Sequence, residues 1–166
     1  MSIEQTKDLL KFLKPFPGKI IETTLWLREF VWKLYPECNE LIYDNYNAVA
    51  FGWSATDRLG AVFCTIAVGR SSGNVHFGFY RGSEIADPKK LLLGKGNQYR
   101  YVLVTDKKEF PAAYMKKLLK EAHSNTMSGI KGKDLTIKGA TITKSISAVK
   151  RKEGAALKLM KKKAPK

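Results

Sequence analysis

The chain has 166 residues, of which 44% are apolar, and it carries a formal net charge of +15 at pH 7. This composition excludes a wholly disordered polypeptide, and the length predicts one folded domain with room for an extension. No apolar run approaches the roughly 20 residues that a membrane-spanning helix needs. The first ten residues are charged where a signal peptide is apolar. The sequence therefore predicts a cytoplasmic protein that does not enter a membrane.

The first part of the chain predicts two helices. Residues 3–14 group leucines loosely on one face and are followed by two prolines, which end a helix. Residues 19–35 repeat apolar positions with a period near 3.6, and Pro36 stops the pattern. We expect this longer helix to bury one face.

The middle of the chain predicts strands joined by hairpins. Residues 39–54 are rich in β-branched and aromatic residues, with an internal Asp-Asn pair that favours a turn or bulge. Residues 61–68 are apolar on both alternating faces, which is typical of a strand that is covered on both sides. A turn at 71–74 leads into further strands at 75–82 and 98–104.

A closing helix is predicted over residues 109–123. Helices that flank hairpin-connected strands predict an α+β fold, an antiparallel sheet with helices packed on one face. We assign this domain to residues 1–128. Residues 129–166 form a lysine-rich extension, with twelve basic residues against Asp134 and Glu153, a net charge of +10.

The extension is expected to be partly extended or disordered. Residues 141–149 alternate in polarity, which allows a strand or an extended segment that covers the second face of the sheet. Residues 150–166 predict a disordered basic arm. Such an arm favours salt-dependent, non-specific binding of nucleic acid or another polyanion, and a merely solubilising tail is the alternative. The residues concerned are Lys150, Arg151, Lys152, Lys158, Lys161, Lys162 and Lys163.

Residues 79–102 combine a proline and a Gly-x-Gly sequence with several basic residues. Pro88 is suited to start a short helix with Asp87 as its N-cap, and Gly94 to end it in a left-handed conformation. Glycine turns expose backbone amides, and with an arginine they suit phosphate, sulfate or carboxylate. We interpret the stretch as a turn, with an anion site as the alternative. The anion-site candidates are Arg81, Lys95, Gly96 and Arg100.

A second candidate site lies around the first two predicted strands, where aromatic and amide side chains indicate a pocket at one end of the sheet. Packing in the core explains the tryptophan equally well. The candidates are Tyr43, Asn45, Asn47 and Trp53. The sequence has no recognisable catalytic constellation, and its two histidines and two cysteines lack the spacing of zinc ligands.

An ordered series of motifs resembles the YdhG-like domain, a bacterial family of unknown function. The series lies within residues 20–123 and includes Tyr43-Asp44, Phe77-Gly78-Phe79, Arg81-Gly82, Asp87-Pro88 and Gly94-x-Gly96. The resemblance implies a compact α-β sandwich of the frataxin-like kind, and it implies no reaction. One branch of the family is similar to an intracellular iron chaperone.

For iron, the resemblance implies oxygen ligands on the first long helix, where Glu22 and Glu29 share a face. These carboxylates are sparse and lie among basic residues, so an ordinary solvent-facing surface is the alternative. We therefore expect a small non-enzymatic binding protein for an anionic ligand or polyanion, with an iron chaperone as the alternative function. No other metal or cofactor is expected, and monomer and homodimer both remain open.

Overall fold

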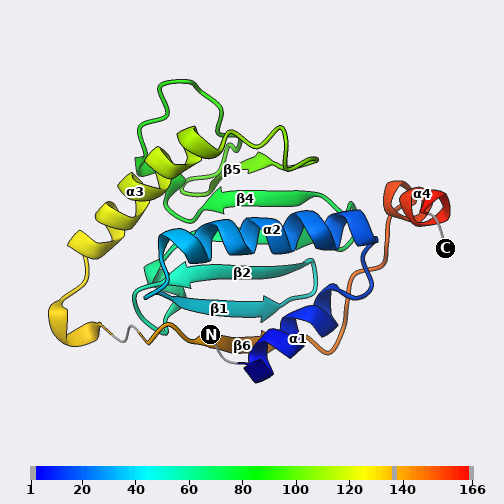
Figure 1. Ribbon diagram of the computed structural model, residues 1–166, viewed down its shortest axis with the longest axis horizontal. Coiled ribbons are helices and arrows are strands. Elements are labelled where there is room, and N and C mark those ends of the chain that lie inside the picture. Colours follow the sequence, from blue (N-terminus) through cyan, green and yellow to red (C-terminus); the bar gives the residue numbers. More distant parts are fainter. Residues whose placement is uncertain (1–2, 136–137, 165–166) are drawn as a thin grey trace.

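The computed structural model describes residues 3–135 and 138–164 and has the predicted α+β class (Figure 1). The helices of the described residues are α1 (Ile3–Leu13), α2 (Gly18–Leu34), α3 (Ala112–Ser128) and α4 (Ala155–Lys163). The strands are β1 (Asn39–Asp44), β2 (Ala48–Ser54), β3 (Val62–Gly69), β4 (Val75–Phe79), β5 (Arg100–Leu103) and β6 (Thr141–Ile146). None of these helices is both long and apolar enough to cross a membrane.

The strands form one six-stranded sheet in the order β5-β4-β3-β2-β1-β6. Strands β1 to β5 pair antiparallel with their neighbours, as the hairpin signals predict. Strand β6 pairs parallel with β1, so the sheet is mixed and not wholly antiparallel. The chain returns to β1 only after α3, and a long crossover connection permits parallel pairing where a hairpin does not.

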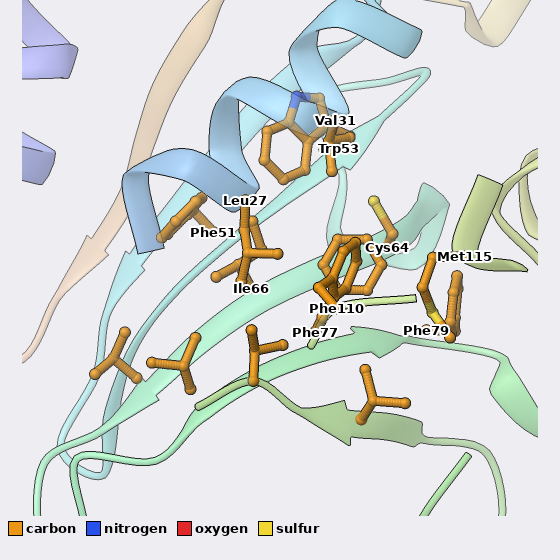
Figure 2. Packing of buried hydrophobic residues seen from close by; sticks show 14 of the residues in the cluster. Leu27, Val31, Phe51, Trp53, Cys64, Ile66, Phe77, Phe79, Phe110 and Met115 are labelled. Atoms are coloured by element: carbon orange, nitrogen blue, oxygen red, sulfur yellow. The ribbon is translucent and has the colours of Figure 1, made fainter. Parts of the chain in front are cut away.

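The core lies between the sheet and the helices on one of its faces. Helix α2 crosses that face, and Leu27 and Val31 point from it towards the strands (Figure 2). Both residues are fully buried, which confirms the amphipathic helix predicted over residues 19–35. Burying each such side chain contributes about 1.5–3 kcal/mol. The strands and α3 supply Phe51, Trp53, Cys64, Ile66, Phe77, Phe79 and Met115.

Two predictions for the C-terminal extension are wrong. Strand β6 lies at the edge of the sheet beside β1 and does not cover the second face. Residues 155–163 form α4 where a disordered arm was predicted, and Leu157 is only 1% exposed. Leu157 and Ile20 both pack against the backbone of Gly73. Residues 165–166, the end of the predicted arm, lie outside the described residues.

The stretch between β4 and β5 also differs in part from its prediction. Pro88 lies in a turn and starts no helix. The carboxylate of Asp87 accepts hydrogen bonds from the backbone amide of Leu92 at 2.8 Å and from the hydroxyl of Tyr114. A side chain that captures nearby amides closes a turn and competes with helix formation. Gly94 has a positive φ of 121°, as the turn interpretation predicts.

Candidate functional site

The face of the sheet opposite α2 and α3 carries small side chains at its centre. Strand register places Ala50 of β2 beside Ala67 of β3, and Ala67 beside His76 of β4. The next row along the strands places Gly52 beside Thr65. The sequence pattern of β3 predicted a covering layer here. Instead, Ala50, Thr65 and Ala67 are only half-buried.

A cavity of about 530 Å³ lies over these small residues. A smaller cavity of about 140 Å³ adjoins it and shares Ala50, Thr65 and Tyr80 with it. Together the two cavities form what we call the open-face trough. The larger cavity is lined by Ala48, Ala50, Thr65, Ala67, Gly69, His76, Tyr80, Gln98 and Tyr99. The smaller is lined by Tyr43, Asn45, Ala50, Gly52, Leu59, Val62, Thr65 and Tyr80.

One wall of the trough depends on a glycine. The ring of Tyr99 lies directly over Gly78 of β4, and a Cβ atom at that position would overlap the ring. Any other residue at position 78 would therefore displace this wall. Burial raises the pKa of Tyr99 above its usual value, which favours the neutral phenol.

His76 and two tyrosines form a ladder of rings along β4 and β5. The ring of His76 stacks on Tyr101 with centroids 4.1 Å apart and an interplanar angle of 11°. Tyr101 in turn stacks on Tyr99 with centroids 5.6 Å apart. Burial lowers the pKa of His76, which favours its neutral form. The ladder holds the His76 ring in a fixed orientation at the side of the trough.

The connection between β2 and β3 contributes to the lining of the smaller cavity. Within this connection, the backbone amide of Thr56 donates to Ser54 Oγ at 3.1 Å, and the amide of Arg58 donates to Thr56 Oγ1 at 3.0 Å. These local bonds fix the turn that brings Leu59 and Val62 to the lining.

The predicted pocket residues divide between two faces of the sheet. Tyr43 and Asn45 line the smaller cavity, and burial raises the pKa of Tyr43. Asn47 lies outside both linings and accepts a hydrogen bond from Arg151 at 3.3 Å. Trp53 is fully buried on the opposite face, edge-on to Trp32 at 5.9 Å, as the core-packing explanation predicts.

Sequence reasoning missed the floor and the far wall of the trough. Ala48, Ala50 and Gly52 alternate on one face of β2, and this row of small residues was the available signal. Gln98 and Tyr99 come from a segment far along the chain, so only the folded structure brings them to the same cavity.

The predicted anion-site arginines both have partners within the chain. Arg81 forms an ion pair with Glu84 at 2.9 Å. Arg100 donates from Nη1 to the backbone oxygens of Gly96 at 2.6 Å and Tyr99 at 2.8 Å. Arg100 therefore fastens the loop that precedes β5, and Lys95 is exposed on that loop. Anion binding at this corner stays a prediction.

The two carboxylates proposed for iron are also paired. Glu22 contacts Lys107 at 2.6 Å, and this lysine lowers the pKa of Glu22. Glu29 contacts Lys33 at 2.8 Å. Among the residues that the structure describes, no group of three or more His, Cys, Asp or Glu side chains is placed to hold a metal ion.

The basic residues of the extension fall into two sets. Lys150 is bound to the carboxylate of Asp44 at 2.7 Å, and Arg70 bonds the same carboxylate. Lys161 pairs with Glu153. Arg151 is exposed, although it contacts Asn47. The other exposed members of the predicted set are Lys152, Lys158, Lys162 and Lys163.

Comparison with protein-family models, with curated proteins and with solved structures gave no match for this chain. The resemblance to the YdhG-like family therefore stays a prediction from its motifs. The case for a site rests on the geometry of the chain itself.

Proposed function

We propose that this protein is a binding module that takes a small molecule in the open-face trough. The observation that carries the proposal is the cavity of about 530 Å³ over Ala50 and Ala67, which is walled by aromatic rings and adjoins the smaller cavity that Leu59 lines. Ligand sites in proteins span about 300–1,000 Å³ and are lined by apolar and aromatic side chains with a few polar groups. The open-face trough has this size and this lining.

The floor of the trough supports binding because it is already ordered. Ala50 and Ala67 lie on neighbouring strands near the centre of the sheet, and each strand is paired on both sides. A ligand therefore gains contact without having to order the backbone beneath it, and a preformed site loses less free energy on binding.

The test is a titration of ¹⁵N-labelled protein with a library of small aromatic and aliphatic fragments. Fragments are expected to shift the amide signals of Ala48, Ala67 and Gly69. The substitution Ala67→Phe fills the floor and should weaken these fragments at least tenfold. Ala156→Phe, on the exposed side of α4, is the matched control and should leave binding unchanged. Equal binding to both variants would exclude the trough as the site.

Binding of a polyanion by the C-terminal segment is a second candidate function. It is favoured by the exposed lysines of α4 and of the loop before it, which the docking of Leu157 holds on one part of the surface. Lysines release counterions from a phosphate backbone, so the affinity for duplex DNA should fall steeply with salt.

Deleting residues 150–166 would also remove Leu157 and Lys150, which bind the body of the protein. Substitution of the exposed lysines is therefore the cleaner test. Replacing the exposed lysines by glutamine should reduce the slope of log affinity against log salt by about 0.9 for each lysine that contacts a phosphate. The four positions are Lys152, Lys158, Lys162 and Lys163. A control with the same charge change replaces the exposed Lys89, Lys90, Lys116 and Lys120. Equal slopes for the two variants would show that net charge alone governs binding.

A further inference from the structure

We infer that the open-face trough selects uncharged, flat, aromatic molecules and discriminates against their anionic analogues. The inference rests on the proposed function and adds the chemical class of the ligand. Three features of the lining carry it: its charge, its shape and its few neutral polar groups.

The lining is uncharged although the chain is strongly basic. None of the residues that line the two cavities is an aspartate, glutamate, lysine or arginine, whereas the whole chain carries a net charge of +15. His76 and Tyr99 both have pKa values displaced in the direction of their neutral forms. A charged ligand would lose hydration here without gaining a partner of opposite charge, and that loss is costly.

Apart from Thr65, the floor is flat because its side chains are nearly absent. Ala48, Ala50, Ala67 and Gly69 project at most one methyl group above the sheet, on strands that lie about 4.8 Å apart. A planar ring system makes continuous contact with such a surface, whereas a bulky aliphatic molecule touches it only in part. The walls of tyrosine and histidine rings offer aromatic edges and faces to the same ligand.

Neutral polar groups line the trough beside the small residues of the floor. Gln98 and Tyr80 line the larger cavity and offer an amide and a hydroxyl. The hydroxyl of Thr65, in the middle of the floor, already donates to the backbone oxygen of Phe51 at 3.2 Å. The amide of Gln98 and the hydroxyl of Tyr80 therefore suit a ligand with an apolar body and one polar substituent.

Two fluorescent probes test this selection directly. N-phenyl-1-naphthylamine and 8-anilino-1-naphthalenesulfonate share a ring system and differ by one sulfonate group. At 150 mM salt, the neutral probe should bind wild-type protein with enhanced fluorescence, and Ala67→Phe should weaken it at least tenfold. The anionic probe can also bind to the basic surface outside the trough. Its binding in the trough is therefore taken as the part that Ala67→Phe removes. That part should be at least tenfold weaker than binding of the neutral probe, and Ala156→Phe should change neither.

The outcomes separate the two proposals. If neither probe shows binding that depends on position 67, the open-face trough is not a small-molecule site and both proposals fail. If both probes bind there with similar affinity, the trough is a ligand site but the inference about charge is wrong. Should Ala67→Phe unfold the protein, chemical shifts of wild-type Ala48 and Gly69 amides during each titration give the same comparison. Shifts elsewhere would overturn the assignment.

Discussion

The buried ion pair between Arg28 and Glu40 joins three elements of the fold. Arg28 of α2 donates from two nitrogens to the two carboxylate oxygens of Glu40, each at 2.7 Å. Glu40 is fully buried in β1, and it also accepts a hydrogen bond from Thr141 of β6 at 3.1 Å. A buried pair adds little over apolar packing, but an unpaired buried charge is strongly destabilising.

We therefore expect Glu40→Ala to lower the free energy of unfolding by about 3–5 kcal/mol, because it leaves Arg28 buried without its partner. Glu29→Ala removes the exposed pair with Lys33 and should change the free energy of unfolding by no more than about 1 kcal/mol. Urea unfolding of the two variants measures the difference. Similar small losses for both would mean that Arg28 finds water or another partner.

His123 gives the stability a dependence on pH. Its ring packs on Tyr35 at 4.9 Å and against Phe63 at 5.1 Å, and burial lowers its pKa from the usual 6.5. Below pH 6.5 the unfolded chain takes up the proton more readily than the folded chain does. The contribution of His123 to the free energy of unfolding is therefore complete above pH 6.5. It is lost as the pH falls from 6.5 to the lower pKa that His123 has in the folded chain.

For His123→Phe, we expect a shallower fall in the free energy of unfolding between pH 6.5 and 5 than for the wild type. Urea unfolding at half-unit steps measures both curves. His76 has its pKa lowered in the same way, so some slope should persist in the variant. Parallel curves for wild type and variant would show that His123 titrates alike in the folded and unfolded chains.

At the scale of elements, α4 is fastened to the body by the buried side chain of Leu157 and by polar bonds before the helix. Leu157 is 1% exposed, whereas Leu159, two residues later on the same helix, is 53% exposed. Before the helix, Lys150 binds Asp44, and the amide of Gly154 donates to the backbone oxygen of Ser71 at 2.8 Å. A nine-residue helix is too short to be stable alone in water, so its order depends on this docking.

The two leucines of α4 form a matched pair for a test of this docking. Leu157→Ala should lower the free energy of unfolding by about 2–5 kcal/mol, since it leaves a cavity beside Ile20 and Gly73. Leu159→Ala has the same helix propensity change and should stay within about 0.5 kcal/mol of wild type. Calorimetric melting of both variants gives the comparison. Equal effects would mean that α4 does not depend on Leu157.

At the scale of the whole molecule, the sequence predicted the elements whose signals are local. The periodic apolar positions of α2 and the hairpin signals of β1 to β5 were sufficient to predict these elements. The parallel pairing of β6 and the docking of α4 were not predicted, because a lysine-rich pattern does not reveal which distant residues it meets. For the candidate site, Tyr43 and Asn45 were identified, but the floor required the register that aligns Ala50 with Ala67.

Hydrogen exchange across the whole chain tests this arrangement at once. Amides of β2 and β3 should exchange most slowly, because both strands are paired on each side and pack beneath α2. Edge strands β5 and β6 should exchange faster, and the exposed loop around Lys95 faster still. Amides of α4 should exchange well below the rate of a free peptide, although faster than the amides of β3. Exchange of α4 at free-peptide rates would contradict its docking and restore the disordered arm, because only an attached helix shields these amides from water.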